Sequence, residues 1–172
     1  GEPRLERRKP PAFLPARRAS KYGRIVSIGR LSAMKEYNLY MIEVIAALKK
    51  KGYAVTWTVF GTGEYESQMR QLIEKHNLGD AISLEGTIDY QHMWQALSDA
   101  HIFVGMGTAV LEAALFKVPN VIAQPYDRSG ITCGSVCRLP SGSITPGKAT
   151  SVNLRVIDEI ERILTFEAEQ YR

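Results

Sequence analysis

Short apolar segments alternate with amphipathic helical segments through most of the sequence, and this alternation restricts the fold more than any other feature. Strands rich in apolar and β-branched residues are expected at 24–28, 55–60, 82–84, 102–104 and 120–123. Helices are expected between them at 38–50, 64–76, 90–98 and 108–116, because apolar residues recur there at three- and four-residue steps. Five strands joined by short helical connections predict an α/β fold with a doubly wound parallel sheet and helices on both faces.

The two ends of the sequence differ in composition from this alternating part. Residues 1–24 hold eight Lys or Arg against two Glu, so the net charge of +4 arises there and the rest of the chain is slightly acidic. We expect a flexible basic linker at 1–21, with contact to anionic lipid or nucleic acid as the less favoured alternative. A folded domain at 22–125, a Gly/Ser/Pro-rich loop at 126–152 and a final helix at 153–172 complete the expected organisation.

Composition excludes several classes of protein and site. Apolar residues make up 45% of the chain and charged residues 23%, which is ordinary for a soluble globular domain. The longest apolar region is interrupted by Glu112 and Lys117, so no membrane-spanning segment is expected. Cys133 and Cys137 lie four positions apart without a neighbouring histidine, which is not a zinc pattern. We expect no metal, no cofactor, no nucleic-acid partner and a cytoplasmic setting, with peripheral contact to a membrane left open. Since the chain begins with Gly, we expect a piece of a longer protein.

Ligands of open parallel sheets bind beyond the carboxyl ends of the strands, which directs attention to the loops there. The loop after the first strand reads G-R-L-S-A-M-K. Gly29 permits a close backbone approach, Arg30 offers a planar fork of donors and Lys35 a point charge, a combination that suits a phosphate or diphosphate. Exposed cations flanking a helix are the alternative interpretation.

The loop after the fourth strand carries the strongest signal. Two glycines precede a helix, so the N–H groups of Gly107, Thr108 and Ala109 are expected to point at an anion. Glu112 follows one turn into the helix among apolar neighbours, where a carboxylate needs a partner. It is either a satisfied structural acid or an acceptor for the two hydroxyls of a ribose.

The two remaining loops have weaker signatures. Gly61 and Gly63 lack the third glycine of a dinucleotide-binding turn, so a glycine turn that opens a helix is expected. After the third strand, Asp89 is expected to cap the next helix. The functional alternative there is that main-chain groups of Thr87 and Ile88 pair with the edge of a nucleobase.

Together these loops resemble a known family. The ordered series G-R-L-x-x-x-K, G-x-G, L-x-G and G-x-G-x-x-x-x-E-A-A-x-x-x-x-P is similar to the C-terminal, nucleotide-sugar-binding half of GT-B glycosyltransferases, most of all the retaining family 4 type. The resemblance covers roughly residues 24–123. It implies a Rossmann-like sheet that forms one of two domains, and a nucleotide-diphosphate sugar as substrate.

The resemblance also implies a role for each loop. The first would grip the donor diphosphate, the fourth would cradle phosphate and hold the ribose hydroxyls, and the third would contact the base through its main chain. The residues of the first loop are Arg30 and Lys35. Those of the fourth are Gly107, Thr108, Ala109 and Glu112, and those of the third are Thr87 and Ile88. Fixed cations and helix N–H groups would stabilise the departing nucleoside diphosphate without a metal.

One position departs from the family pattern. A glutamate normally lies eight residues before the second one, and here that position is Val104, which leaves the sugar and the stereochemical outcome open. The expected partner is an N-terminal domain of the same protein, which would supply catalytic groups for polysaccharide or glycoconjugate synthesis. A nucleotide-sugar epimerase half-domain and a degenerate, non-catalytic binding or scaffold domain are the alternatives.

Overall fold

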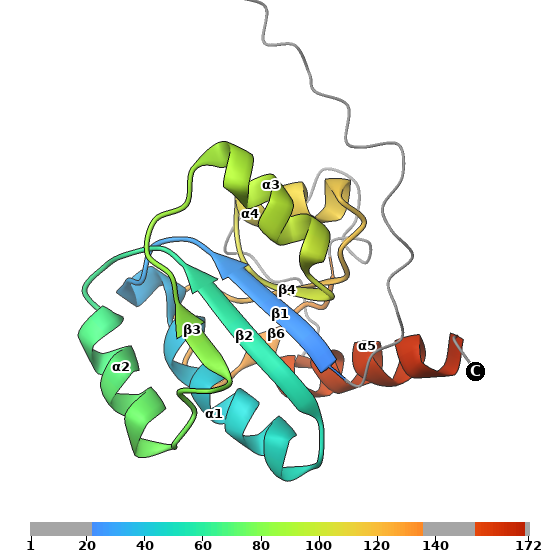
Figure 1. The fold of residues 1–172 in the computed structure, drawn as a ribbon, viewed down its shortest axis with the longest axis horizontal. Coiled ribbons are helices and arrows are strands. Elements are labelled where there is room, and N and C mark those ends of the chain that lie inside the picture. Colours follow the sequence, from blue (N-terminus) through green and yellow to red (C-terminus); the bar gives the residue numbers. More distant parts are fainter. Residues whose placement is uncertain (1–21, 136–153, 171–172) are drawn as a thin grey trace, which may run out of the picture.

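The computed structural model describes residues 22–135 and 154–170, and its centre is a five-stranded parallel sheet (Figure 1). The strand order is β3-β2-β1-β4-β5. The strands are β1 (Tyr22–Ile28), β2 (Ala54–Phe60), β3 (Ile82–Leu84), β4 (Ile102–Gly105) and β5 (Asn120–Ile122). The chain runs outward from β1 to β3, then crosses back to β4 beside β1, so the prediction of a doubly wound parallel sheet is confirmed.

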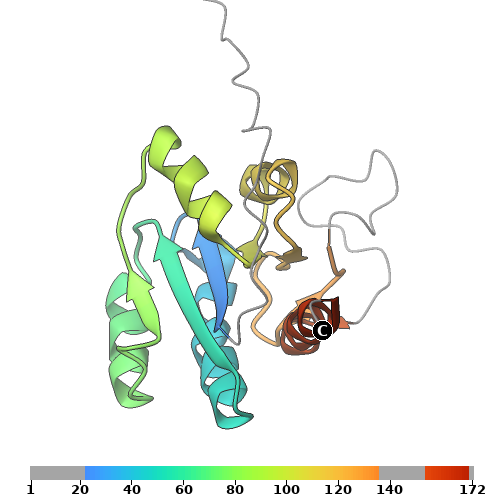
Figure 2. The same ribbon diagram turned by 45° about the vertical axis from the view of Figure 1, so that its right-hand side comes forward.

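Helices cover both faces of the sheet (Figures 1 and 2). Two separate apolar clusters form beneath them. The larger cluster lies under α1 (Tyr37–Lys50), α2 (Glu66–Lys75) and α5 (Val156–Gln170). The smaller one lies under α3 (Tyr90–Asp99) and α4 (Thr108–Leu115). A short 3-10 helix, η1 (Ala33–Lys35), precedes α1. The observed helices and strands differ from the predicted bounds by one to three residues at most ends.

A buried polar chain joins the three central strands. The Trp57 indole N–H donates to the Ser27 hydroxyl at 2.9 Å, and that hydroxyl donates to the Val104 carbonyl at 2.6 Å. The Val104 side chain is fully buried in the larger apolar cluster. A carboxylate at this position would be buried in the core away from water, at a large cost in free energy. An acidic residue at position 104 is therefore incompatible with this packing.

The region after β5 corrects one prediction. The expected continuous loop at 126–152 contains a strand, β6 (Ile131–Thr132), which pairs antiparallel with β7 (Leu154–Arg155) directly before α5. Neither segment shows the length or alternation by which a strand is recognised in sequence, and pairing across the chain is what makes them strands. The basic segment 1–21 and residues 136–153 lie outside the described residues.

Candidate functional site

The strand order places the topological switch point, where ligands of such sheets bind, between β1 and β4, because the chain leaves these neighbouring strands in opposite directions. The loops that follow β1 and β4 therefore meet at one edge of the sheet. These are the loops that carry the predicted anion-binding residues. No helix among residues 22–135 and 154–170 is both long and apolar enough to cross a bilayer.

The loop after β1 is fastened to the loop after β2. The Gly29 N–H donates to the Phe60 carbonyl at 2.9 Å, and the Leu31 N–H donates to the Thr62 carbonyl at 3.0 Å. A Cβ at Gly61 would collide with the Gly29 carbonyl, and one at Gly63 with the Leu31 carbonyl. The sequence predicted a glycine turn that opens a helix, and the structure adds that this turn packs against the backbone that carries the two cations.

Lys35 points back over its own loop. Its ammonium lies where a side chain at position 29 would otherwise be, so glycine there leaves it room. Burial, together with the nearby Arg30 charge, lowers the pKa of the Lys35 ammonium from its usual value. The Arg30 side chain is exposed. Two like charges close together, one partly desolvated, form a site that an anion would stabilise.

The start of α4 faces the same space. Gly107 has φ 68° and ψ −147°, a conformation open essentially to glycine alone, and within residues 22–135 and 154–170 no side chain caps the helix after it. The first N–H groups of an α-helix have no partner within the helix. The uncapped start of α4 therefore presents free donors at the positive end of the helix dipole.

Glu112 lies one turn further along α4 and is half-buried. Its carboxylate makes no hydrogen bond or ion pair with any other side chain in the described parts of the chain. A half-buried carboxylate without such partners remains able to accept hydrogen bonds from water or from a ligand. Of the two interpretations left open by the sequence, the observed geometry favours a carboxylate available to a ligand.

These groups line a single cleft, which we call the Lys35 cleft, with a volume of about 510 Å³. Residues from β1, η1, α3, the β4–α4 loop and α4 form its walls: Ile28, Gly29, Met34, Lys35, Tyr90, Met93, Met106, Gly107, Thr108, Ala109 and Glu112. Five of the predicted site residues are thus brought together. Arg30 lies outside this lining but close enough to act electrostatically on Lys35.

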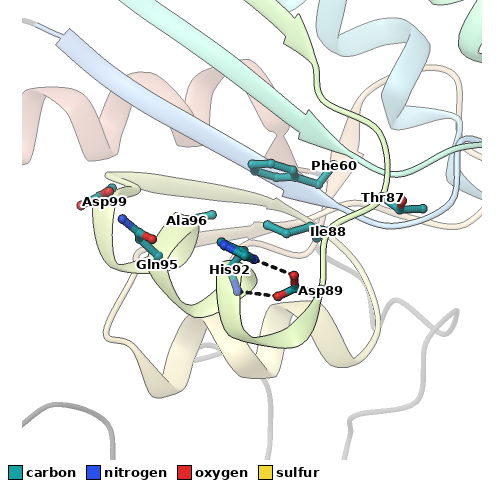
Figure 3. Close-up of a pocket in the computed structure, with 8 residues that line it drawn as sticks. All are labelled: Phe60, Thr87, Ile88, Asp89, His92, Gln95, Ala96 and Asp99. Carbon is teal, nitrogen blue, oxygen red and sulfur yellow. Dashed lines mark hydrogen bonds and ion pairs between the residues drawn. The ribbon is translucent and has the colours of Figure 1, made fainter.

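The two predicted base-contact residues line a second depression, the His92 hollow, of about 400 Å³ (Figure 3). Thr87, Ile88 and Asp89 come from the loop before α3, Phe60 comes from the end of β2, and side chains of α3 line the rest. Asp89 accepts a hydrogen bond from the His92 N–H at 2.9 Å, which confirms the predicted helix cap. The same carboxylate pairs with the His92 ring at 2.6 Å. The first turn of α3 contributes residues to both the hollow and the Lys35 cleft.

Sequence reasoning missed the apolar part of the cleft. Met34, Tyr90, Met93 and Met106 all line it, and Tyr90 is largely exposed. Large apolar residues directly after strands, or at the first turn of a helix, are the signal that was available. Among the described residues no group of three or more His, Cys, Asp or Glu side chains is arranged to hold a metal ion.

The sequence is similar to one protein family and to several curated proteins. The profile of the family described as Glycosyl transferases group 1 matches residues 14–133. WcaL of Escherichia coli (strain K12), named as a colanic acid biosynthesis glycosyltransferase, is 28% identical over 109 residues, or 56% of this chain and 27% of WcaL. The amylovoran biosynthesis glycosyltransferase AmsK of Erwinia amylovora is 27% identical over 113 residues, or 59% of this chain and 28% of AmsK. The chain spans about a quarter of the length of these curated relatives.

The fold was also compared with solved structures. A TarM variant from S. aureus, crystallised with UDP among other ligands, superposes with a TM-score of 0.61 at 22% identity, over 87% of this chain and 30% of that one. The catalytic domain of a cholesterol-alpha-glucosyltransferase from Helicobacter pylori gives a TM-score of 0.55 at 19% identity, over 87% of this chain and 96% of that one. At these identities the similarity concerns the fold.

Proposed function

The chain belongs to the glycosyl transferases group 1 family, and from this premise we propose that the Lys35 cleft binds the nucleoside diphosphate of a nucleotide-sugar donor. Lys35 and Arg30 attract the diphosphate. The N–H groups of Gly107, Thr108 and Ala109 complete its hydrogen bonds at the start of α4.

The ribose and the base occupy the positions next to the diphosphate. Glu112 accepts hydrogen bonds from the ribose hydroxyls, and the main chain of Thr87 and Ile88 meets the edge of the base. One observation supports the proposal above the others. An ammonium, a free helix start and a carboxylate share one cleft, and neither charged side chain has an oppositely charged partner in the described parts of the chain.

The same groups have a role in the chemistry of sugar transfer. When the bond between the sugar and the diphosphate breaks, negative charge builds on the departing nucleoside diphosphate. Fixed cations and helix N–H groups stabilise that charge with little reorganisation. Because Val104 is buried in the core, no acid from this position of β4 reaches the sugar, so we propose that the acceptor site and the catalytic groups come from a second domain of the same protein.

The relatives indicate a class of product and a first donor to test. WcaL and AmsK are named for the biosynthesis of colanic acid and amylovoran, and on this basis we propose a role in polysaccharide synthesis. UDP is present in the TarM structure, which makes UDP the first nucleotide to titrate. The 172-residue chain is expected to bind nucleoside diphosphates weakly and to transfer no sugar by itself.

Calorimetric titration of the chain with UDP, GDP and ADP tests the proposal. Lys35→Ala is expected to weaken binding of the preferred nucleotide by at least about tenfold, since hydrogen bonds to charged groups contribute roughly 1.5–3 kcal/mol. Arg30→Ala is expected to have a smaller effect because that side chain is exposed.

Lys50→Ala is the matched control, because Lys50 is an exposed lysine at the far end of α1. It is expected to leave the affinity unchanged. If no nucleoside diphosphate binds, or if the Lys35 and Lys50 variants bind equally well, the proposed function is wrong.

A further inference from the structure

Glu36 follows Lys35 directly and is buried, with only 4% of its surface exposed. It lies at the junction of η1 and α1, before the first turn of a helix whose own packing is apolar. A buried carboxylate is costly unless it is paired and hydrogen-bonded. Its partners therefore indicate what the buried charge contributes.

Both partners of Glu36 come from other loops at the same edge of the sheet. The Tyr65 hydroxyl, just before α2, donates to a Glu36 carboxylate oxygen at 2.6 Å. The Arg128 guanidinium, from the segment after β5, lies 3.3 Å from the same oxygen. One carboxylate thus links the loops that follow β1, β2 and β5.

Backbone contacts fasten the Lys35 loop to the same two segments. The Tyr65 N–H donates to the Leu31 carbonyl at 3.0 Å, and the Tyr126 N–H donates to the Met34 carbonyl at 3.0 Å. Asn38, fully buried in the first turn of α1, donates to the Lys35 carbonyl at 3.1 Å. These contacts hold the Lys35 loop against the segments before α2 and after β5 and against the first turn of α1. Among the charged groups in these contacts, only Glu36 is buried.

Resting on the proposed function, we infer that Glu36 is a positioning residue, which holds the Lys35 ammonium in the donor cleft through its contacts with Tyr65 and Arg128. The lysine needs such support. It is partly desolvated beside Arg30 and has no acidic partner among the described residues, so without restraint the side chain would move outward to water. A buried ion pair often adds little to stability, whereas it restricts geometry.

A double-mutant cycle with UDP as the probe tests this inference. Glu36→Gln keeps the shape of the side chain but removes its charge, and is expected to weaken UDP binding by about five- to tenfold in an otherwise unchanged chain. In the Lys35→Ala background the same substitution is expected to have almost no effect, because the group it positions is gone. A contribution to stability alone would not produce this coupling.

Two further variants keep the inference testable if Glu36→Gln destabilises the fold. Arg128→Ala removes the second partner at a position whose side chain is 81% exposed, so the fold is expected to survive and UDP binding to weaken by a few fold. Glu159→Gln is the matched control, because Glu159 is an equally buried carboxylate that pairs with Arg162 on α5. It is expected to change the melting temperature but not the affinity for UDP.

The outcomes separate this inference from the proposed function. If Lys35→Ala weakens UDP binding and Glu36→Gln does not, or if the two effects simply add, Glu36 does not act through Lys35 and only the inference is overturned. If the unaltered chain binds neither UDP nor another nucleoside diphosphate, both are overturned.

Discussion

The Lys35 cleft and the His92 hollow both include residues of the first turn of α3, but the charged side chains that line them differ in whether they are paired. In the hollow, Asp89 and His92 satisfy each other and both are exposed. In the cleft, the Lys35 ammonium and the Glu112 carboxylate are half-buried, and neither pairs in this way with any side chain that the structure describes. Charges that a fold leaves unpaired and partly desolvated are prepared for a ligand, whereas paired surface charges contribute to local structure.

The largest expected effect comes from the start of α4. Gly107→Ala forces a side chain into a backbone conformation that costs on the order of 1–3 kcal/mol, and it disturbs the N–H groups at the cleft. Chemical unfolding is expected to show a lower free energy of unfolding, and UDP titration is expected to show a lower affinity. Gly52→Ala is the control, because Gly52 also has positive φ but lies after α1, away from the cleft. Equal UDP affinities for the two variants would contradict a role for the α4 start.

Glu112 gives the next largest effect. Glu112→Gln is expected to weaken UDP binding by about tenfold, since one charged hydrogen-bond acceptor for the ribose is lost. Inorganic pyrophosphate, which has no ribose, is expected to bind equally well before and after the change. The same substitution should not lower the melting temperature, because the carboxylate has no described partner to lose. A destabilised variant with unchanged UDP affinity would identify Glu112 as a structural acid.

The pH dependence of UDP binding is expected to show the loss of the proton from the Lys35 ammonium. Because burial and then the Arg30 charge lower the pKa of Lys35, the ammonium loses its proton at a lower pH than an ordinary lysine. The charged form binds the diphosphate, so UDP affinity is expected to fall as pH rises through that lowered pKa, at a lower pH than for an ordinary lysine. Lys35→Arg, whose side chain stays protonated there, should give a flat profile. An unchanged slope in this variant would exclude Lys35 as the titrating group.

The smallest effect is expected in the hollow. Asp89→Ala removes the cap of α3 and is expected to lower the melting temperature slightly without changing UDP affinity. The backbone N–H of His92, and then its ring, lower the pKa of Asp89, so the cap is fully effective above the usual carboxyl pKa and is lost as pH falls through the lowered value. A clear loss of UDP affinity would mean that the Asp89–His92 pair itself, and not only the main chain of Thr87 and Ile88, takes part in binding the nucleotide.

Most of the sheet was predictable from sequence because its signals are local. The spacing of apolar residues in segments such as 38–50 and the β-branched run at 55–60 depend only on near neighbours. The β6–β7 pair was not predictable, since two-residue strands carry no pattern of their own. The residues of the candidate site were also chosen from local motifs, but their separation into a cleft and a hollow by α3 was not visible in any motif.

The sequence by itself determined the alternation of strands and helices, the glycines that tight turns require, and the presence of cations directly after the first strand. These depend on short-range sterics and on the period of apolar residues. Only the tertiary structure decided that Lys35, Gly107 and Glu112 share one cleft, and that Glu36 is buried between Tyr65 and Arg128. A glutamate at the start of an amphipathic helix looks like an ordinary surface residue, because burial depends on segments distant in sequence that fold over it.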